Sequence, residues 1–176
     1  FLPASMHLCA RGEHVPIIER LIRTVKERAR AVYNDLPYGP LPTIMVVGLM
    51  NRVTAVLNAF QPQDSAIQQS PLSLVEGRAP MNYTDASIHF GTYVIIYGGT
   101  NNTMDARGVP AIALHKSNDS NGFYFMSLST GKRLNCNKWT VLPIPEGAIR
   151  KIEAMAKRER KRDTPDDESF DLNNEE

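Results

Sequence analysis

The sequence predicts an α+β fold: N-terminal helices, then a small antiparallel β-barrel-like unit, a basic helix and a disordered acidic tail. Three observations predict it. Apolar residues recur every three or four positions in the first third of the chain, short aromatic and β-branched runs separated by turn sequences follow residue 86, and acids gather at the end. The expected divisions are helices at 1–61, a linker at 62–86, the β-rich unit at 87–145, the basic helix at 146–162 and the tail at 163–176.

Residues 14–35 are predicted to form an amphipathic helix. Pro16 suits its first turn, and Pro37 disfavours a helical residue before it, so the helix should end by Leu36. Apolar residues spaced by four, three, four and three positions fall on one face, and they are Ile18, Ile22, Val25, Ala29 and Val32. This face should pack against the rest of the protein.

A second helix is predicted from about Pro42 to Phe60. It is apolar nearly all round, so we expect it to be deeply buried. A polar stretch rich in Gln and Ser follows at 62–71 and is expected to be a linker.

The second half of the chain changes period. Short strands are expected at 88–97, 111–115, 123–128 and 134–142, because turn sequences rich in Gly, Asn and Ser separate these segments. Four or five such strands favour a small barrel or a curled sheet.

Composition excludes several classes of protein. The 176 residues are 42% hydrophobic, too apolar for a wholly disordered chain. The longest apolar run, Ile44 to Met50, falls far short of the roughly 20 residues that a membrane span needs. The two cysteines and four scattered histidines lack the spacing of a zinc site. Because the chain starts at Phe1 and not at Met, we expect it to begin inside a longer product, and its start lacks the features of a signal peptide.

Charge is distributed unevenly along the chain. The last fourteen residues hold seven acids and no base, and the remaining 1–162 carry 20 bases against 12 acids, a net charge of +8. A basic body with an acidic tail favours a polyanionic partner. The alternative for the tail is a solvated segment with no partner.

The polar side of the first predicted helix carries one acid followed by three bases. Glu19, Arg23, Lys26 and Arg30 lie at i, i+4, i+7 and i+11, which aligns them as a single stripe. The simplest interpretation is an ordinary solvated face. The functional interpretation is a carboxylate that binds a divalent metal beside bases that contact a phosphate backbone, an arrangement that suits phosphoryl transfer.

The stripe belongs to a longer pattern, E-R-x-x-R-T-x-x-E-x-A-R, carried by Glu19-Arg20, Arg23-Thr24, Glu27 and Ala29-Arg30. It resembles the final catalytic motif of copia-type retrotransposon integrases. Further stretches resemble later signatures of that family, in the same order, so that the likeness covers about residues 13–142. They are Ser70-Pro71 with Leu74, Gly77-Arg78 and Pro80; His89 to Val94; Gly122 to Phe125 with Ser129 to Leu134; and Asn137 to Val141.

The resemblance implies the end of an RNase H-like catalytic core followed by a small β-rich C-terminal unit. It implies Glu19 as the catalytic glutamate and, only in a complete parent enzyme, as a ligand of Mg²⁺ or Mn²⁺, and it implies DNA contacts for Arg23 and Lys26. Arg20 and Arg30 of the same segment are further candidates for nucleic-acid binding. The family also needs two aspartates upstream, and no Asp precedes Asp35. One carboxylate cannot hold two metals. The chain alone is therefore expected to be an inactive fragment or a decayed copy.

Two further basic segments are candidates for nucleic-acid binding. Lys132, Arg133 and Lys138 flank predicted strands near Tyr124 and Trp139, which favours DNA or RNA binding by a basic hairpin with aromatic residues. The alternative is that the aromatic residues belong to the core and the bases are solvated. The sequence KRERKR at 157–162 fits a nuclear import signal, a phosphate-contacting patch or a solvated linker helix.

The function expected from these features is nucleic-acid binding in DNA integration, as a fragment of a retrotransposon integrase. Its expected partners are the DNA of the element ends and the target and, through self-association, an integrase multimer; no membrane partner is expected. The expected location is intracellular, in the nucleus or in a cytoplasmic particle. The first alternative is a non-catalytic nucleic-acid-binding or polyprotein-linker module from a decayed element, and the second is a protein-interaction domain with no nucleic-acid partner.

Overall fold

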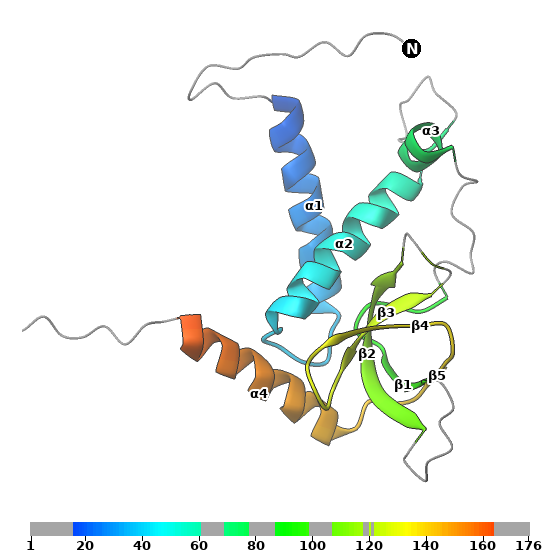
Figure 1. Cartoon of the computed structure of the whole chain (residues 1–176). Coiled ribbons are helices and arrows are strands. Elements are labelled where there is room, and N and C mark those ends of the chain that lie inside the picture. Colours follow the sequence, from blue (N-terminus) through cyan, green and yellow to red (C-terminus); the bar gives the residue numbers. More distant parts are fainter. Residues whose placement is uncertain are drawn as a thin grey trace, which may run out of the picture.

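The predicted α+β class is confirmed in a computed structural model of the chain. The structure describes residues 16–60, 69–77, 87–98, 107–117, 120 and 122–163. Within these residues the chain forms four helices and one five-stranded antiparallel sheet (Figure 1). The acidic tail predicted from residue 163 lies almost wholly outside the described residues.

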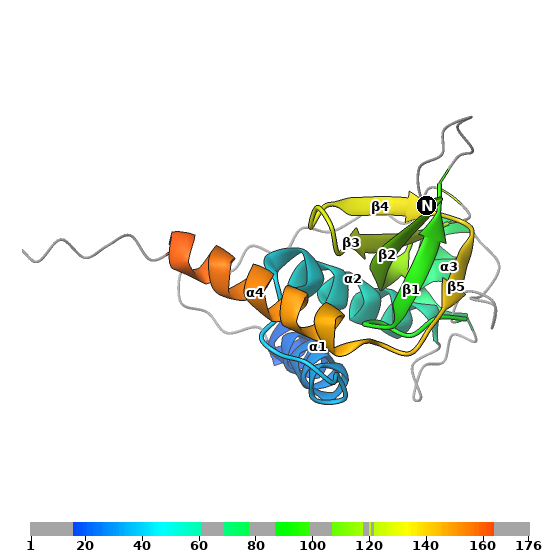
Figure 2. The ribbon, with the colours of Figure 1, turned by 90° about the horizontal axis from the view of Figure 1, so that it is seen from below.

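Two long helices come first, close to the predicted bounds. Helix α1 spans Pro16–Asn34 and helix α2 spans Thr43–Ala59. Helix α1 packs on α2, and α2 packs on the sheet. Figures 1 and 2 both show α2 between α1 and the sheet, so that the protein is built in three layers.

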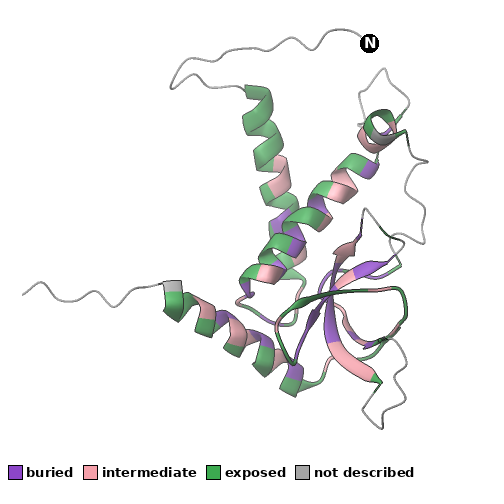
Figure 3. Ribbon diagram, in the orientation of Figure 1, coloured by how far each residue is buried: buried purple, intermediate pink, exposed green. Residues whose placement is uncertain are grey.

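The apolar face of α1 is covered along only part of its length. Ala29 is buried and its neighbours Val25 and Val32 are half-buried, whereas Ile18 and Ile22 are 55% and 48% exposed. Figure 3 shows the first turns of α1 as exposed, and in Figure 1 the two helices diverge toward that end. The expectation of a continuous buried face is therefore wrong for the first half of the helix, because α2 covers only the second half.

The sheet and α1 cover only part of the surface of helix α2, and the expectation that the helix is deeply buried is wrong for the rest. Met45, Leu49 and Val53 face the core, whereas Val46 and Val47 are about half exposed. Composition alone suggested burial on every side, but the sheet and α1 leave part of the helix surface without cover.

A short helix, α3, lies within the segment predicted to be a linker and spans Pro71–Glu76. Its ends have clear physical causes. The backbone N–H of Ser73 donates to the Ser70 hydroxyl at 3.2 Å, and Pro71 occupies the first turn. Gly77 ends the helix at a φ of 63°, a left-handed conformation that favours glycine.

The sheet has the strand order β4-β3-β2-β1-β5, and neighbouring strands are antiparallel. The segment predicted as one strand at 134–142 is split into two by Asn137 and Lys138, which pass from one edge of the sheet to the other. The five strands are β1 (Tyr93–Tyr97), β2 (Gly108–Lys116), β3 (Phe123–Ser127), β4 (Arg133–Cys136) and β5 (Trp139–Val141).

The sheet is strongly curled but is not closed into a barrel. In the strand order, β3 and β5 are three strand spacings apart, about 14 Å in a flat sheet. The Trp139 ring of β5 nevertheless lies 5.1 Å from the ring of Phe123 and 5.5 Å from that of Phe125. The edge strands β4 and β5 do not pair with each other, so side chains and not a ladder join β5 to β3. The predicted barrel-like unit is thus an open, curled sheet.

Side chains on the two faces of the sheet form two core clusters. Alternate residues of a strand point to opposite faces. Accordingly Ile112 and Leu114 of β2 face the helices, whereas Ala111 and Ala113 lie in the cluster enclosed by the curl. The helix-side cluster also includes residues of α1, α2 and the last helix. Both faces of the sheet are therefore covered.

Helix α4, spanning Glu146–Asp163, matches the predicted basic helix. Its apolar face, with Ala148, Ile152 and Ala156, is buried in the structure. Near its other end, the carboxylate of Glu159 accepts a hydrogen bond of 2.6 Å from the backbone N–H of Thr43, the first residue of α2. Because Pro42 has no side-chain acceptor, Glu159 supplies the N-terminal cap that α2 lacks locally.

Replacing Glu159 by alanine should lower the free energy of unfolding by about 1 kcal/mol, the usual cost of losing an N-terminal cap. Equilibrium urea unfolding measures the difference. Glu153→Ala removes the same charge from α4 and leaves the cap in place, so it should have a smaller effect. Equal losses for the two variants would contradict a capping role for Glu159.

Candidate nucleic-acid interface

The stripe predicted from the sequence lies on the exposed surface of α1. Arg20, Arg23, Lys26 and Arg30 are all exposed, and Glu19 is exposed in the first turn. Arg23 Nε lies 3.4 Å from the carboxylate of Glu27, one helical turn further on. Both side chains are largely exposed, so this ion pair adds little stability and leaves Arg23 accessible.

The described residues do not form the metal site that the resemblance implies. Mg²⁺ and Mn²⁺ need several oxygen ligands held together. In the part of the chain that the structure describes, no group of three or more His, Cys, Asp or Glu side chains could hold a metal ion. Glu19 alone does not make a metal site, and the Mg²⁺ or Mn²⁺ that the resemblance implies is expected only in a complete parent enzyme.

The three bases predicted on the β-rich unit are also exposed. Lys132 follows the turn between β3 and β4, Arg133 begins β4, and Lys138 lies at the corner before β5. The guanidinium carbon of Arg133 lies 4.4 Å from the centre of the Tyr124 ring, a cation–π contact that orients this side chain.

The aromatic residues near these bases do not form an open stacking surface. Trp139 is half-buried against Phe123 and Phe125 in the cluster enclosed by the curled sheet. Tyr124 is half-buried, with Arg133 over its ring. The structure therefore favours the alternative in which these aromatic residues stabilise the fold and the bases remain exposed.

His115 lies in the same region, half-buried, with its ring beside that of Tyr124. Its Nδ1 donates to the Lys116 carbonyl at 2.9 Å, so Nε2 is the acceptor that faces Asn51 Nδ2 at 3.4 Å. Burial lowers the pKa of His115, and repulsion from Arg133 and Arg52 lowers it further, whereas the hydrogen bond to the Lys116 carbonyl opposes the shift.

The lowered pKa of His115 should make stability depend on pH. The folded state resists protonation of this ring, so its contribution is fully present above the unfolded-state pKa of 6.5 and is lost as the pH falls toward the folded-state pKa. Urea unfolding of the wild type and of His115→Gln measures this. The difference in free energy of unfolding between the two proteins should be constant above pH 7. At lower pH the wild type should lose stability relative to His115→Gln. A difference independent of pH would contradict the assignment.

The structure separates the α1 stripe from the bases of the sheet, and it brings the β3–β4 turn close to α4. The stripe lies on the outer layer, with α2 between it and the sheet (Figures 1 and 2). The β3–β4 turn, by contrast, lines a cleft together with Arg158 and Arg162 of α4. Both arginines belong to the basic segment KRERKR at 157–162, but nothing in the sequence indicates which turn they face.

A wide apolar groove lies between α1, α2 and the segment that leads into β1. It encloses about 1280 Å³ and is lined by Val32, Leu36, Val56 and Tyr93, among others. The Tyr38 hydroxyl donates to the Gly91 carbonyl at 2.9 Å and joins the α1–α2 connection to the sheet. Burial raises the pKa of Tyr38, so this phenol stays protonated and remains a donor.

No family model matches the chain, and no curated protein and no solved structure matches it. Among the described helices, none has the length and apolar character needed to cross a membrane.

Proposed function

We propose that this chain binds duplex DNA without sequence preference and serves DNA integration as the C-terminal part of an integrase. The observation that carries the proposal is the exposed row of bases along α1, with Arg20, Arg23, Lys26 and Arg30 all accessible. The resemblance of this helix to the last catalytic motif of copia-type integrases supports the choice of DNA as the polyanion. The net charge of +8 on residues 1–162 supports it as well.

The stripe has dimensions that suit a phosphate backbone. Arg23 and Arg30 are seven positions apart, with Lys26 between them, so the three bases extend over about 10 Å of helix at 1.5 Å per residue. Duplex DNA carries one phosphate charge per roughly 1.7 Å of its axis, so about six phosphates lie within that length. Contacts of this kind position a protein on DNA and carry no sequence information.

Salt dependence is the first test of DNA binding. If about four phosphates are neutralised, the logarithm of the binding constant should fall with the logarithm of salt concentration at a slope near −3.6. Fluorescence anisotropy with a labelled duplex of mixed sequence measures this slope, and duplexes of different sequence should give similar values. An affinity that does not change with salt would exclude the proposed mode of binding.

A second test concerns catalysis. The chain alone should not join DNA strands, because two of the three carboxylates that the family uses have no counterpart upstream of Glu19. An oligonucleotide-joining assay in Mg²⁺ or Mn²⁺ should therefore show no product. Joining that depends on Glu19, as shown by its loss in Glu19→Gln, would contradict the proposal that the fragment is inactive.

The apolar groove between α1 and α2 is the observation that favours a different class of function, a protein-interaction domain. Leu21 and Phe60 line the groove and are more than half exposed, and apolar side chains gathered in a groove favour contact with a partner. Weak retention of the chain on immobilised DNA at low salt would favour this alternative over DNA binding. Strong retention that is lost when the bases of α1 are replaced would favour DNA binding. It would fit the integrase fragment and also the related non-catalytic nucleic-acid-binding module.

A further inference from the structure

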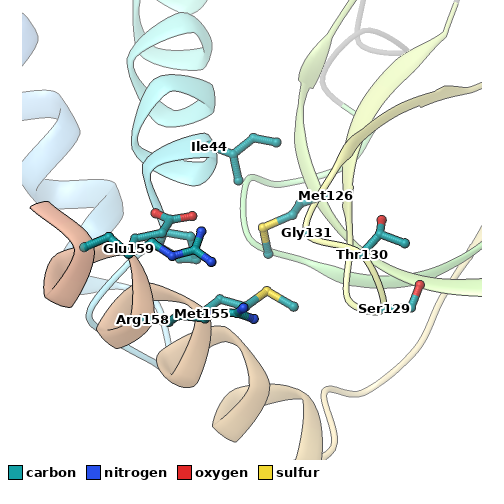
Figure 4. A pocket seen from close by; sticks show the side chains of 10 residues that line it. Ile44, Met126, Ser129, Thr130, Gly131, Met155, Arg158 and Glu159 are labelled. Carbon is teal, nitrogen blue, oxygen red and sulfur yellow. The ribbon is translucent and has the colours of Figure 1, made fainter.

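A cleft of about 340 Å³ opens between the start of α2, the β3–β4 turn and α4 (Figure 4). Its α4 wall carries Met155, Arg158, Glu159 and Arg162, which lie at i, i+3, i+4 and i+7 and therefore share one face of the helix. The opposite wall is the turn at residues 129–131. Figure 4 shows the α4 side chains on one side and Ser129 and Thr130 across from them.

The charge of this cleft is positive. Glu159 is its one acid, and its carboxylate is engaged at 2.6 Å by the backbone N–H of Thr43, at the positive end of the α2 dipole. In the described part of the chain, neither Arg158 nor Arg162 forms an ion pair, whereas Arg150 of the same helix is paired with Glu146 at 3.1 Å. Two guanidinium groups thus remain to attract an anion.

The turn adds hydrogen-bond donors. Ser127 Oγ accepts from the backbone N–H groups of Ser129 at 3.3 Å and Thr130 at 3.4 Å, so its own hydrogen is left for its contact with Ser129 Oγ at 2.8 Å. Thr130 Oγ1 accepts from the N–H of Lys132 at 3.3 Å. The hydroxyl hydrogens of Ser129 and Thr130 are therefore not used by these bonds.

We propose that the cleft between α4 and the β3–β4 turn is a phosphate-binding site, with Arg158 and Arg162 as its charged ligands and Ser129 and Thr130 as neutral donors. A phosphate group offers acceptors only, and guanidinium groups match it with two parallel hydrogen bonds. The cleft volume is at the lower end for small-ligand sites, which suits a phosphate together with part of the molecule that carries it. The proposal does not require the α1 stripe to bind DNA.

Inorganic phosphate is the probe, and the test is a ¹⁵N NMR titration of the full chain at constant ionic strength. Phosphate should shift the backbone signals of Ser129, Thr130 and Gly131 and the Nε–H signals of Arg158 and Arg162. All these shifts should saturate and should give the same dissociation constant. Sodium chloride at equal ionic strength should not reproduce these shifts. A titration without saturation would overturn the proposal.

The double variant Arg158→Ala/Arg162→Ala should weaken phosphate binding at least tenfold. Lys157→Ala/Lys161→Ala is the matched control, because it removes two charges at the same spacing from exposed positions of α4 that do not line the cleft. The control variant should change the dissociation constant for phosphate less than twofold. Equal losses of phosphate affinity in the arginine and lysine variants would mean that the overall charge of the protein attracts phosphate. That result would overturn the proposed site. Arg158→Gln/Arg162→Gln repeats the test should the alanine variant prove unfolded by circular dichroism.

A duplex-DNA arm of the titration identifies the source of the phosphate. If DNA shifts the same signals and the arginine variant loses affinity for DNA, the cleft binds the nucleic-acid backbone. If that variant loses phosphate binding but keeps its affinity for DNA, the cleft binds a small phosphorylated molecule. If the chain has no affinity for DNA but binds phosphate in the cleft, the proposed DNA-binding function fails and the site stands.

Discussion

Replacing Arg23, Lys26 and Arg30 together by alanine should weaken binding to duplex DNA on the order of 100-fold near 0.2 M salt, if each base contacts one phosphate. The loss of three contacts should also make the salt slope shallower by about 2.7. The fold should survive, because exposed substitutions of this kind usually change stability by roughly 0.5 kcal/mol or less each. Anisotropy titrations at several salt concentrations measure the affinity, after circular dichroism melts have confirmed folding.

Arg28 provides the control for the stripe. It is exposed and lies two residues before Arg30, but on the opposite side of α1, where it borders the apolar groove. Arg30→Ala should therefore weaken DNA binding more than Arg28→Ala, although each removes one arginine. If the triple variant keeps both affinity and salt slope, the stripe is an ordinary solvated helix face.

The sequence predicts the long helices well because their evidence is local. Apolar spacing and the prolines at the ends identify α1, α2 and α4 to within a few residues. The same evidence does not predict what covers an apolar face. Ile18 continues the pattern of Ala29 on one side of α1, yet only Ala29 lies where α2 reaches. Periodicity defines a face, and burial depends on the neighbouring element.

The curled sheet illustrates a second limit. Residues 134–142 have the composition of one strand, but Asn137 and Lys138 break it, and β5 pairs with β1 more than 40 residues earlier. Nothing local indicates that Trp139 reaches the rings of β3. The cap that Glu159 gives α2, across 116 residues, is equally invisible in the sequence. Such long-range contacts are determined by the packed fold as a whole.

The sequence also predicts one part of the candidate site and not another. Exposure of the predicted bases Arg20, Arg23, Lys26 and Arg30 follows from helical spacing, and the structure agrees with it. The pairing of Arg158 and Arg162 with the turn at 129–131 joins segments about thirty residues apart, so the sequence shows both halves of the cleft without showing that they meet.

Gly91→Ala should lower the free energy of unfolding by about 2–5 kcal/mol, the sum of the cost of a left-handed conformation and the cost of overpacking. The backbone at Gly91 has a φ of 82°, which side chains other than glycine rarely adopt. An added methyl group would overlap Leu36 and would lie 2.9 Å from the Tyr38 hydroxyl. That hydroxyl donates to the Gly91 carbonyl, so a shift of the backbone would also strain a buried hydrogen bond. Urea unfolding measures the loss.

Gly77→Ala separates the two causes. Gly77 also has a positive φ, 63°, but among the described residues no atom other than those of its chain neighbours lies within 4 Å of the position that an added methyl group would take. Its replacement should cost about 1–2 kcal/mol, the conformational part alone. Equal losses at the two positions would show that crowding at Gly91 is relieved by small movements of Leu36. A larger loss at Gly91, with DNA affinity unchanged below the melting temperature, would show that the Phe90-Gly91 pair of the integrase-like signature stabilises the junction between helices and sheet and takes no part in binding.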